Sequence, residues 1–507
     1  MFKIFRNYWM IEGILIGLKT ALSLKNILMV MMGCFFGTII GMLPGLGPMT
    51  AIALMIPITY GFDPATGLIL MAGVYYGAVF GGSTSSILIN APGIPGTVAT
   101  SFDGYPMAQQ GKAGKALAIA AYSSFAGGTI AAIFLLFAAP SLSKVSLSFR
   151  SPDYFALMIL GLTAVAAFSS KGQFLKAMMM AVLGLMLASV GQDTLSDIPR
   201  FVFNNMNLSD GISFVLVVMA TFAMSEALMI ILRGTDPSSA AKAISLKELG
   251  SIKLDKEETK KTLITIPRSS IIGFIVGVLP GAGSTIGSFL AYGMERNFVS
   301  KEEKEKFGKG SVHGLAAPET ANNAACSGSF VPLLTLGIPG SGTTAVMLGA
   351  LLGFGIQPGP RLYMTNPEIF WSVIMSMYIG MVVLLILNLP LIPYIARILA
   401  VPRTFLIPMI LFFSVTGIYL MSFNTFDIFL MIGIAIVATG LRLYKFPMPP
   451  LILAFVLGGL MEENLRRSLL ISDGSFSFLW ERPVTAVIIV FTILIVSWQA
   501  YQSLKSK

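Results

Sequence analysis

The sequence predicts an all-α polytopic membrane protein with about 10–13 transmembrane helices in two homologous repeats. Of its 507 residues, 55% are hydrophobic and only 11% are charged, whereas an ordinary soluble domain is about 25% charged. Apolar stretches close to the ~20 residues that cross a bilayer recur along the chain, and glycine or proline interrupts several of them. A Pro/Gly motif also occurs twice, which indicates a duplication with broken or re-entrant helices.

The duplication is carried by two motifs. The run GTIIGMLPGLG at residues 37–47 returns as GFIVGVLPGAG at residues 273–283, and seven of the eleven positions are identical. The run GIPG occurs at residues 93–96 and 337–340, each time after a small polar run. In this alignment of the two copies, Ser83 and Ser85 correspond to Ser327 and Ser329. The two GIPG copies lie 244 residues apart in the sequence, and the two copies of the first motif lie 236 residues apart.

Four segments follow from this pattern. We expect an N-terminal amphipathic or first membrane helix at residues 1–25, a first repeat at 26–232, a cytoplasmic linker at 233–268 and a second repeat at 269–507. The linker carries eight Lys/Arg against five acids, which places it in the cytoplasm. If each repeat holds an odd number of spans, the halves are inverted in the membrane, as in many secondary transporters.

Several protein classes are excluded by what the chain contains. The net charge of +10 reflects basic cytoplasmic loops and gives no reason to expect nucleic-acid binding. Two cysteines and the single His313 supply neither a disulfide framework nor a metal cage. No P-loop, H-E-x-x-H or G-x-S-x-G motif is present, so we expect no enzyme. We expect no cofactor and no metal beyond a coupling Na⁺ or H⁺, since an ion gradient remains the energy source.

The two motifs predict a ligand site near the bilayer midplane. A helix that stops inside a membrane exposes N–H groups at its start, which bind carboxylates, and carbonyl groups at its end, which bind Na⁺. Neighbouring hydroxyl and amide groups donate to an anion without burying an unpaired charge. The predicted substrate-binding residues are Ser83, Thr84, Ser85, Asn90, Gly93, Gly96, Thr97, Asn322, Asn323, Ser327, Ser329, Gly337, Gly340, Ser341 and Thr343. A cation-binding or hinge role is assigned to Pro44, Gly45, Gly47, Pro280, Gly281, Gly283, Glu319 and Thr320.

Alternative interpretations stay open for some of these residues. Small residues also let membrane helices pack closely without forming a site. Glu319 is either a functional intramembrane acid or a cap of the helix that follows Pro318. His313 is expected in a loop, the polar stretch 101–116 is expected as a loop, and Asp63 and Asp103 are expected in turns.

The residues resemble a known family. The stretches GMLPGLGPMTAIALMIPITYGFDP, GGSTSSILINAPGIPGT, DGYPMAQQGKAGKAL and APETANNAACSGSFVPLLTLGIPGSGTTA are similar to the large membrane subunit of the tripartite tricarboxylate transporters, the TctA family. The matching motif positions are Pro44–Gly47, Ser83–Ser86, Pro92–Thr97, Pro318–Asn323 and Gly337–Gly342.

The resemblance implies a function and its partners. It implies a multi-pass permease of the bacterial inner membrane that imports di- and tricarboxylates. The import would be driven by a cation gradient, and Na⁺ is the expected cation. A small membrane subunit and a periplasmic solute-binding protein would be its partners, besides the lipid bilayer. The alternative is a passive anion or cation channel, which would not accumulate substrate against a gradient.

Overall fold

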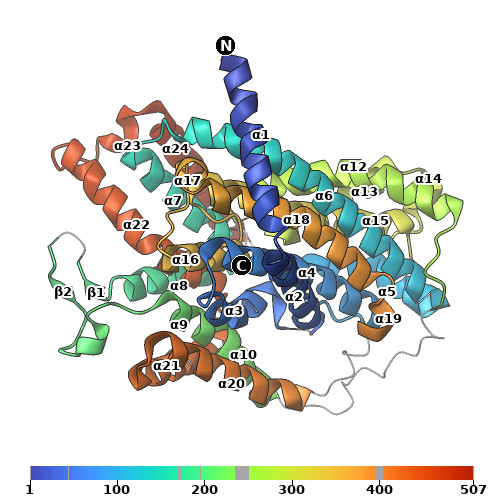
Figure 1. Cartoon of the computed structure of the whole chain (residues 1–507), viewed down its shortest axis with the longest axis horizontal. Coiled ribbons are helices and arrows are strands. Elements are labelled where there is room, and N and C mark those ends of the chain that lie inside the picture. Colours follow the sequence, from blue (N-terminus) through green and yellow to red (C-terminus); the bar gives the residue numbers. More distant parts are fainter. Residues whose placement is uncertain are drawn as a thin grey trace.

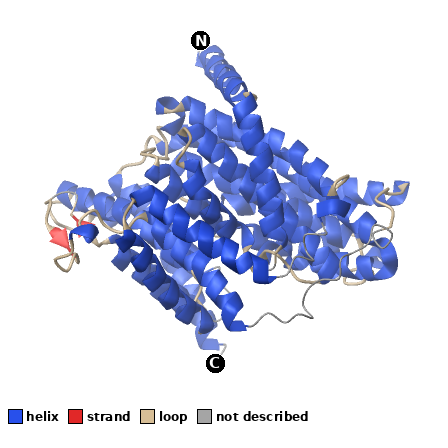
Figure 2. Cartoon of the chain, turned by 60° about the horizontal axis from the view of Figure 1, so that its bottom comes forward, coloured by secondary structure: helices blue, strands red, loops and turns tan. Residues whose placement is uncertain are grey.

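The protein is almost entirely helical (Figures 1 and 2). The computed structural model describes residues 2–505 except 44, 168–172, 194–195, 234–249, 282 and 396–402. Within these residues, seven helices are long and apolar enough to cross a membrane. Shorter apolar helices cover Gly47–Thr59, Ser151–Ala167, Phe174–Ala188, Gly342–Gly353, Ile407–Ser422 and Pro483–Gln499. The predicted all-α polytopic membrane fold is confirmed, while the inverted arrangement of the repeats stays a prediction.

The first half runs to residue 233. Its elements are α1 (Phe2–Ala21), α2 (Leu24–Met42), α3 (Gly47–Thr59), α4 (Pro64–Ile89), η1 (Pro95–Thr97), α5 (Val98–Met107), η2 (Ala108–Lys112), α6 (Ala113–Ser146), α7 (Ser151–Ala167), α8 (Phe174–Ala188), β1 (Gly191–Gln192), β2 (Pro199–Arg200), η3 (Met206–Leu208), α9 (Phe214–Val218), η4 (Met219–Met224) and α10 (Ser225–Arg233). Strands β1 and β2 pair antiparallel in a small hairpin at the edge of the helical body (Figure 2). Helix α1 projects from that body at the N-terminus (Figure 1).

The second half follows the linker, of which residues 234–249 lie outside the described part of the chain. Its elements are α12 (Lys256–Val278), α13 (Gly283–Phe298), α14 (Lys301–Lys304), α15 (Val312–Leu336), α16 (Gly342–Gly353), α17 (Leu362–Thr365), α18 (Pro367–Asn388), α19 (Ile392–Ile395), α20 (Arg403–Ser422), α21 (Thr425–Leu443), α22 (Pro449–Ile471), α23 (Phe478–Glu481) and α24 (Pro483–Lys505). Helix α12 thus begins within the last part of the predicted linker.

The helices break at the four motifs, as predicted. The LPGxG runs separate α2 from α3 and α12 from α13, and the GIPG runs follow α4 and α15. Gly45 and Gly281 have φ angles of +97° and +81°, a conformation that glycine adopts without a steric penalty. Asn90 ends α4 and Gly337 ends α15, both in the left-handed conformation. The breaks are therefore local consequences of residue type.

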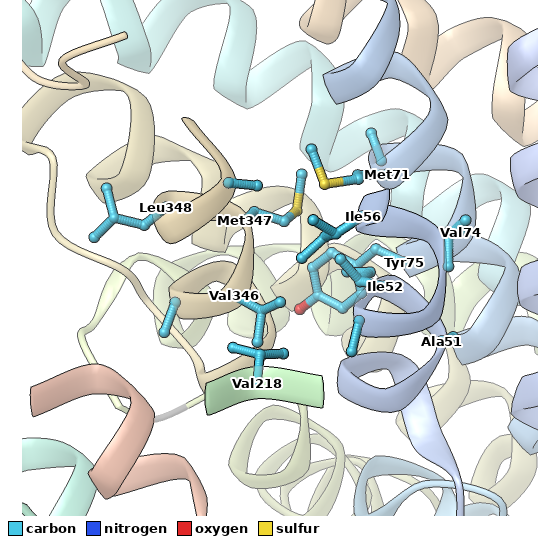
Figure 3. Close-up of a cluster of buried hydrophobic side chains, with 14 of the residues drawn as sticks. Ala51, Ile52, Ile56, Met71, Val74, Tyr75, Val218, Val346, Met347 and Leu348 are labelled. Carbon is cyan, nitrogen blue, oxygen red and sulfur yellow. The ribbon is translucent and has the colours of Figure 1, made fainter. Parts of the chain in front are cut away.

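Two helices form the centre of the molecule. Every residue from Ala65 to Leu88 of α4 and from His313 to Thr335 of α15 is buried. Helix α4 packs against α2, α3 and α18, and α15 packs against α6, α12 and α13. Figure 3 shows side chains of α3, α4, α9 and α16 converging around Tyr75 in this core. The polar runs that follow the first motif thus lie in the interior of the protein.

Glycines let the paired helices touch backbone to backbone. A Cβ atom at Gly41 of α2 would lie 2.1 Å from a carbonyl oxygen of α4, and one at Gly277 of α12 would lie 2.3 Å from a carbonyl oxygen of α15. Gly37 and Gly273 make the same kind of approach. The close-packing interpretation is correct for these four positions, because no larger side chain fits at such distances.

The spatial register of the halves differs from the sequence register. A Cβ at Gly81 would meet the carbonyl oxygen of Thr38 at 2.1 Å, and one at Gly328 would meet that of Phe274 at 2.5 Å. These contacts make Gly81 equivalent to Gly328, whereas the sequence register pairs it with Ala325. The pairing of Ser83 with Ser327 is therefore not kept in space. The reason is that α4 ends before its GIPG run while α15 ends on the first glycine of its own.

The polar stretch 101–116 is helical, which corrects the expectation of a loop. It comprises most of α5, then η2 and the start of α6, with Gly111 at φ +76° as the kink. Asp103 lies inside α5 and accepts backbone hydrogen bonds from Gly308, Gly310 and Ser311 at 2.7–2.9 Å. It therefore ties α5 to the loop before α15, and its assignment to a turn is wrong.

The expected loop position of His313 is wrong, whereas the expected turn position of Asp63 agrees with the structure. His313 lies in the first turn of α15 rather than in a loop, and its Nδ1 atom is 2.7 Å from Thr265 Oγ1. Asp63 caps the N-terminus of α4 and pairs with Lys25 at 2.6 Å. Burial raises the pKa of Asp63, but hydrogen bonds from Lys25 and Thr66 outweigh it and lower the pKa to about 2. Its place between α3 and α4 agrees with the expected turn.

Candidate functional site

The polar run of α15 contains buried groups without partners. Glu319, Thr320, Asn322 and Asn323 are all fully buried. Both side-chain polar atoms of Asn322, the Oδ1 atom of Asn323 and the Oγ1 atom of Thr320 have no hydrogen-bond partner. Such groups are rare because each costs about 1–3 kcal/mol when it is left unpaired. Their concentration within one turn of helix makes this turn the candidate for a ligand site.

Asn322 faces the starts of two helices, one from each half. A Cβ atom at Gly96, in η1 before α5, would lie 2.8 Å from Asn322 Oδ1 and 3.0 Å from Ser284 Oγ. Ser284 lies in the first turn of α13. A helix start carries a partial positive charge and unpaired N–H groups, both of which favour an anion. The arrangement therefore places two side chains of the second half that can donate to a carboxylate, Asn322 and Ser284, beside the Gly96 backbone of the first half.

The helix that follows the other GIPG run begins in apolar surroundings. A Cβ at Gly342, the first residue of α16, would lie 2.9 Å from Met49 Sδ of α3 and 3.0 Å from Pro449 Cβ. The start of α16 is capped by Ser341, whose Oγ accepts from the N–H of Thr344. Packing and capping thus close the start of α16, whereas the polar side chains of Asn322 and Ser284 lie beside Gly96.

Glu319 lies one turn before Asn322 and is bonded to three hydroxyl groups. Ser83 and Ser124 donate to its Oε2 atom at 2.7 and 2.8 Å, and Thr100 donates to its Oε1 atom. These three residues belong to α4, α6 and α5, so the carboxylate joins the second half to the first. Glu319 does not cap a helix, because the N-cap of α15 is Ser311. The capping alternative is thereby excluded.

Several predicted ligands bond to the protein itself. Ser85 and Ser329 donate to carbonyl groups three residues earlier in their own helices. Ser327 shares a 2.7 Å hydrogen bond with the Tyr76 hydroxyl, and Thr97 donates to a carbonyl of its own turn at 3.0 Å. Their hydroxyl groups have partners in the protein, unlike the unpartnered polar atoms of Thr320, Asn322 and Asn323. The role of these hydroxyl groups as ligands stays a prediction.

Other predicted residues shape the backbone around the GIPG runs. Gly93 approaches the carbonyl of Gly41 so closely that a Cβ would lie 1.9 Å from it. Gly340 accepts a 3.0 Å hydrogen bond from the N–H of Gly281. Thr343 is buried in the first turn of α16. The GIPG run thus contacts the end of α2 in the first half and the LPGxG turn in the second half.

The residues of the LPGxG runs that are predicted to act as a hinge or to bind a cation form tight turns. Pro44 lies outside the described residues. Gly47 and Gly283 have positive φ angles of 64° and 58°, and Pro280 lies in the turn after α12. Whether these residues bend during transport or bind a cation stays a prediction.

The structure adds residues that the sequence pattern did not single out. Ser284 follows LPGAG directly, so extending the repeated run by one residue would have found it. Ser124 follows Ser123 in an otherwise apolar stretch and carries no sequence signal. Glu226 lies beside Gly45, whose Cβ position is 3.0 Å from Glu226 Oε1, and pairs with Arg442. In the part of the chain that the structure describes, no group of three or more His, Cys, Asp or Glu could hold a metal ion.

Comparisons with known proteins agree with this architecture. The model of the tripartite tricarboxylate transporter TctA family matches residues 27–453. An uncharacterized 52.8 kDa protein in the TAR-I ttuC′ 3′ region of Agrobacterium vitis is 41% identical over 498 residues, which cover 98% of each chain. An uncharacterized protein in the TAR-II ttuC′ 3′ region of the same organism is 41% identical over 235 residues, which cover 46% of this chain and 96% of that protein. The chain therefore belongs to the tripartite tricarboxylate transporter TctA family, a family of multi-pass membrane transporters rather than of enzymes.

Proposed function

We propose that the chain is the large permease subunit of a tripartite importer in the bacterial inner membrane. It takes up di- and tricarboxylates as a secondary active transporter driven by a cation gradient. Its partners are a small membrane subunit and a periplasmic solute-binding protein, as the family implies. The observation that carries this proposal is the unpartnered amide of Asn322 between the starts of α5 and α13.

The chemistry of this place suits a carboxylate. Asn322 Nδ2 and the hydroxyl of Ser284 donate hydrogen bonds, and the two helix starts add partial positive charge. The GIPG run contains no Lys or Arg, so the substrate would rest on dipoles and small polar groups. Such a site binds a carboxylate without an ion pair, which would be costly to break at each transport cycle.

The location between the halves suits alternating access. Gly96 belongs to the first half, whereas Ser284 and Asn322 belong to the second. A displacement of one half against the other would take the site apart from one side of the membrane, as in transporters built from repeats. A passive channel, in contrast, needs no displacement of one half of the chain against the other.

The test is accumulation in proteoliposomes that contain the full chain with its small membrane subunit, supplied with the solute-binding protein. Labelled succinate, malate, tartrate and citrate are offered with an inward Na⁺ gradient. We expect at least one of them to accumulate above its external concentration. Equilibration without accumulation would identify a passive channel and overturn the proposal.

Asn322→Ala tests the site itself. We expect it to reduce uptake at low substrate concentration at least about tenfold, because a hydrogen bond to a charged group is lost. Asn464→Ala is the matched control, since the Asn464 amide donates only to a carbonyl of its own helix, α22. Normal uptake by Asn322→Ala would rule out this placement of the substrate.

A further inference from the structure

A small cavity lies beside Glu319, where helices of both halves meet. Its lining residues come from α4, α6, α15 and α18 and include Ser83, Ser124, Glu319 and Asn388. It has room for roughly one water-sized particle. The substrate site described above is a separate feature, because Asn322, Gly96 and Ser284 do not line this cavity.

Asn388 contributes a buried oxygen without a partner. The residue is 4% exposed, and its Nδ2 atom donates to the carbonyl of Leu384 at 3.0 Å. Since only the nitrogen of an amide donates to a carbonyl, this bond assigns the other amide atom as the oxygen. That Oδ1 atom has no hydrogen-bond partner. Asn388 of α18, with this unpartnered oxygen, and Glu319 of α15 thus line one cavity.

An ionised Glu319 in this place would need a counter-charge, either a bound cation or a proton. Glu319 is the one charged or titratable side chain among the cavity-lining residues. No ion pair to Glu319 is found among the described residues, and three hydroxyl groups alone do not balance a buried carboxylate, which is costly to leave unpaired. A single negative charge in a one-particle cavity matches one monovalent cation. Carboxylate, hydroxyl and amide oxygens are hard donors, which suit an alkali or similar cation rather than a soft metal.

We propose that Glu319, Ser83, Ser124 and Asn388 form a Na⁺ site that couples the ion gradient to carboxylate movement. The coupling role rests on the proposed function, whereas the site itself rests on the cavity and its oxygens. The two halves share the site, because Ser83 and Ser124 belong to the first and Glu319 and Asn388 to the second.

The Na⁺ site and the substrate site are linked through two helices. Glu319 precedes Asn322 by about one turn of α15, and Thr100, which donates to Glu319, lies about one turn after Gly96 at the start of α5. A cation bound at Glu319 and an anion bound at Asn322 attract each other across this short separation. Each ligand therefore raises the affinity for the other, since such coupling is reciprocal.

The test measures Na⁺ directly, without carboxylate transport. Binding of ²²Na⁺ is measured on the full chain purified with its small membrane subunit, with choline as the replacement cation. We expect saturable binding, a loss of at least about tenfold in affinity for Asn388→Ala, and no detectable binding for Glu319→Gln. Ser376→Ala is the control, because the buried Ser376 hydroxyl of α18 bonds only to a carbonyl of its own helix.

The outcomes separate this inference from the proposed function. Unchanged affinity in Asn388→Ala would overturn the site, and this variant carries the test if Glu319→Gln fails to fold. Absence of ²²Na⁺ binding by the wild type, together with uptake driven by a proton gradient, would also overturn it while leaving the importer intact. Saturable binding that needs Asn388, in a protein that never accumulates carboxylate, would keep the Na⁺ site and refute the importer.

Discussion

Gly96→Ala adds one methyl group at the point where the two halves meet. The new Cβ would lie 2.8 Å from Asn322 Oδ1 and 3.0 Å from Ser284 Oγ. Real Cβ atoms hardly ever come this close to another heavy atom, so one of the two side chains must move. Both neighbours are the ends of side chains rather than backbone, and the fold can therefore accommodate the change by turning the Asn322 amide.

The magnitude follows from what that turn removes. Moderate overpacking costs about 1–3 kcal/mol of stability, which a folded membrane protein tolerates. A hydrogen bond between the amide and a bound carboxylate contributes about 1.5–3 kcal/mol, equivalent to roughly 10- to 150-fold in affinity. We therefore expect the KM for uptake to rise at least about tenfold, while the protein remains monodisperse and its Tm changes little.

The assay is concentration-dependent uptake of labelled carboxylate into proteoliposomes, with the amount of inserted protein measured in parallel. Gly293→Ala is the control, because a Cβ at this position of α13 has no atom within 4 Å. A KM for Gly96→Ala equal to that of the wild type would refute the reasoning, since the methyl group cannot be placed without displacing Asn322 or Ser284.

Two further predictions concern the framework around the site. Gly41→Ala places a Cβ 2.1 Å from a backbone carbonyl of α4 and should abolish monodisperse protein in size-exclusion chromatography, whereas Gly440→Ala, with no atom within 4 Å, should be silent. Glu226→Ala leaves the mostly buried Arg442 guanidinium without its carboxylate and should cost about 3–5 kcal/mol. Thermal unfolding should then show a marked drop in Tm that Arg442→Met partly restores in the double variant; an unchanged Tm for Glu226→Ala would contradict this role of the ion pair.

Local chemistry determined where the helices break. Proline lacks an N–H group and glycine tolerates positive φ angles, so LPGxG and GIPG interrupt a helix wherever they stand. The membrane fold follows in the same way from the 55% hydrophobic composition and the length of the apolar stretches. The sequence also singled out Asn322 and Glu319, because polar residues are expensive inside a membrane and lay next to a break.

The tertiary structure decided which polar residues share a site. Ser83 and Ser85 are alike in the sequence, yet Ser83 bonds to Glu319 while Ser85 bonds to its own helix, because successive helical residues face different directions. Asn388 and Ser124 carried no pattern, since their partners lie on helices far along the chain. The sequence by itself determined the membrane fold and the helix breaks, which depend on residue type and short spacing. Only the packing of α4 against α6 and α15 decided the register of the halves and the groups that meet at Asn322 and Glu319, because these contacts depend on distances that no local pattern encodes.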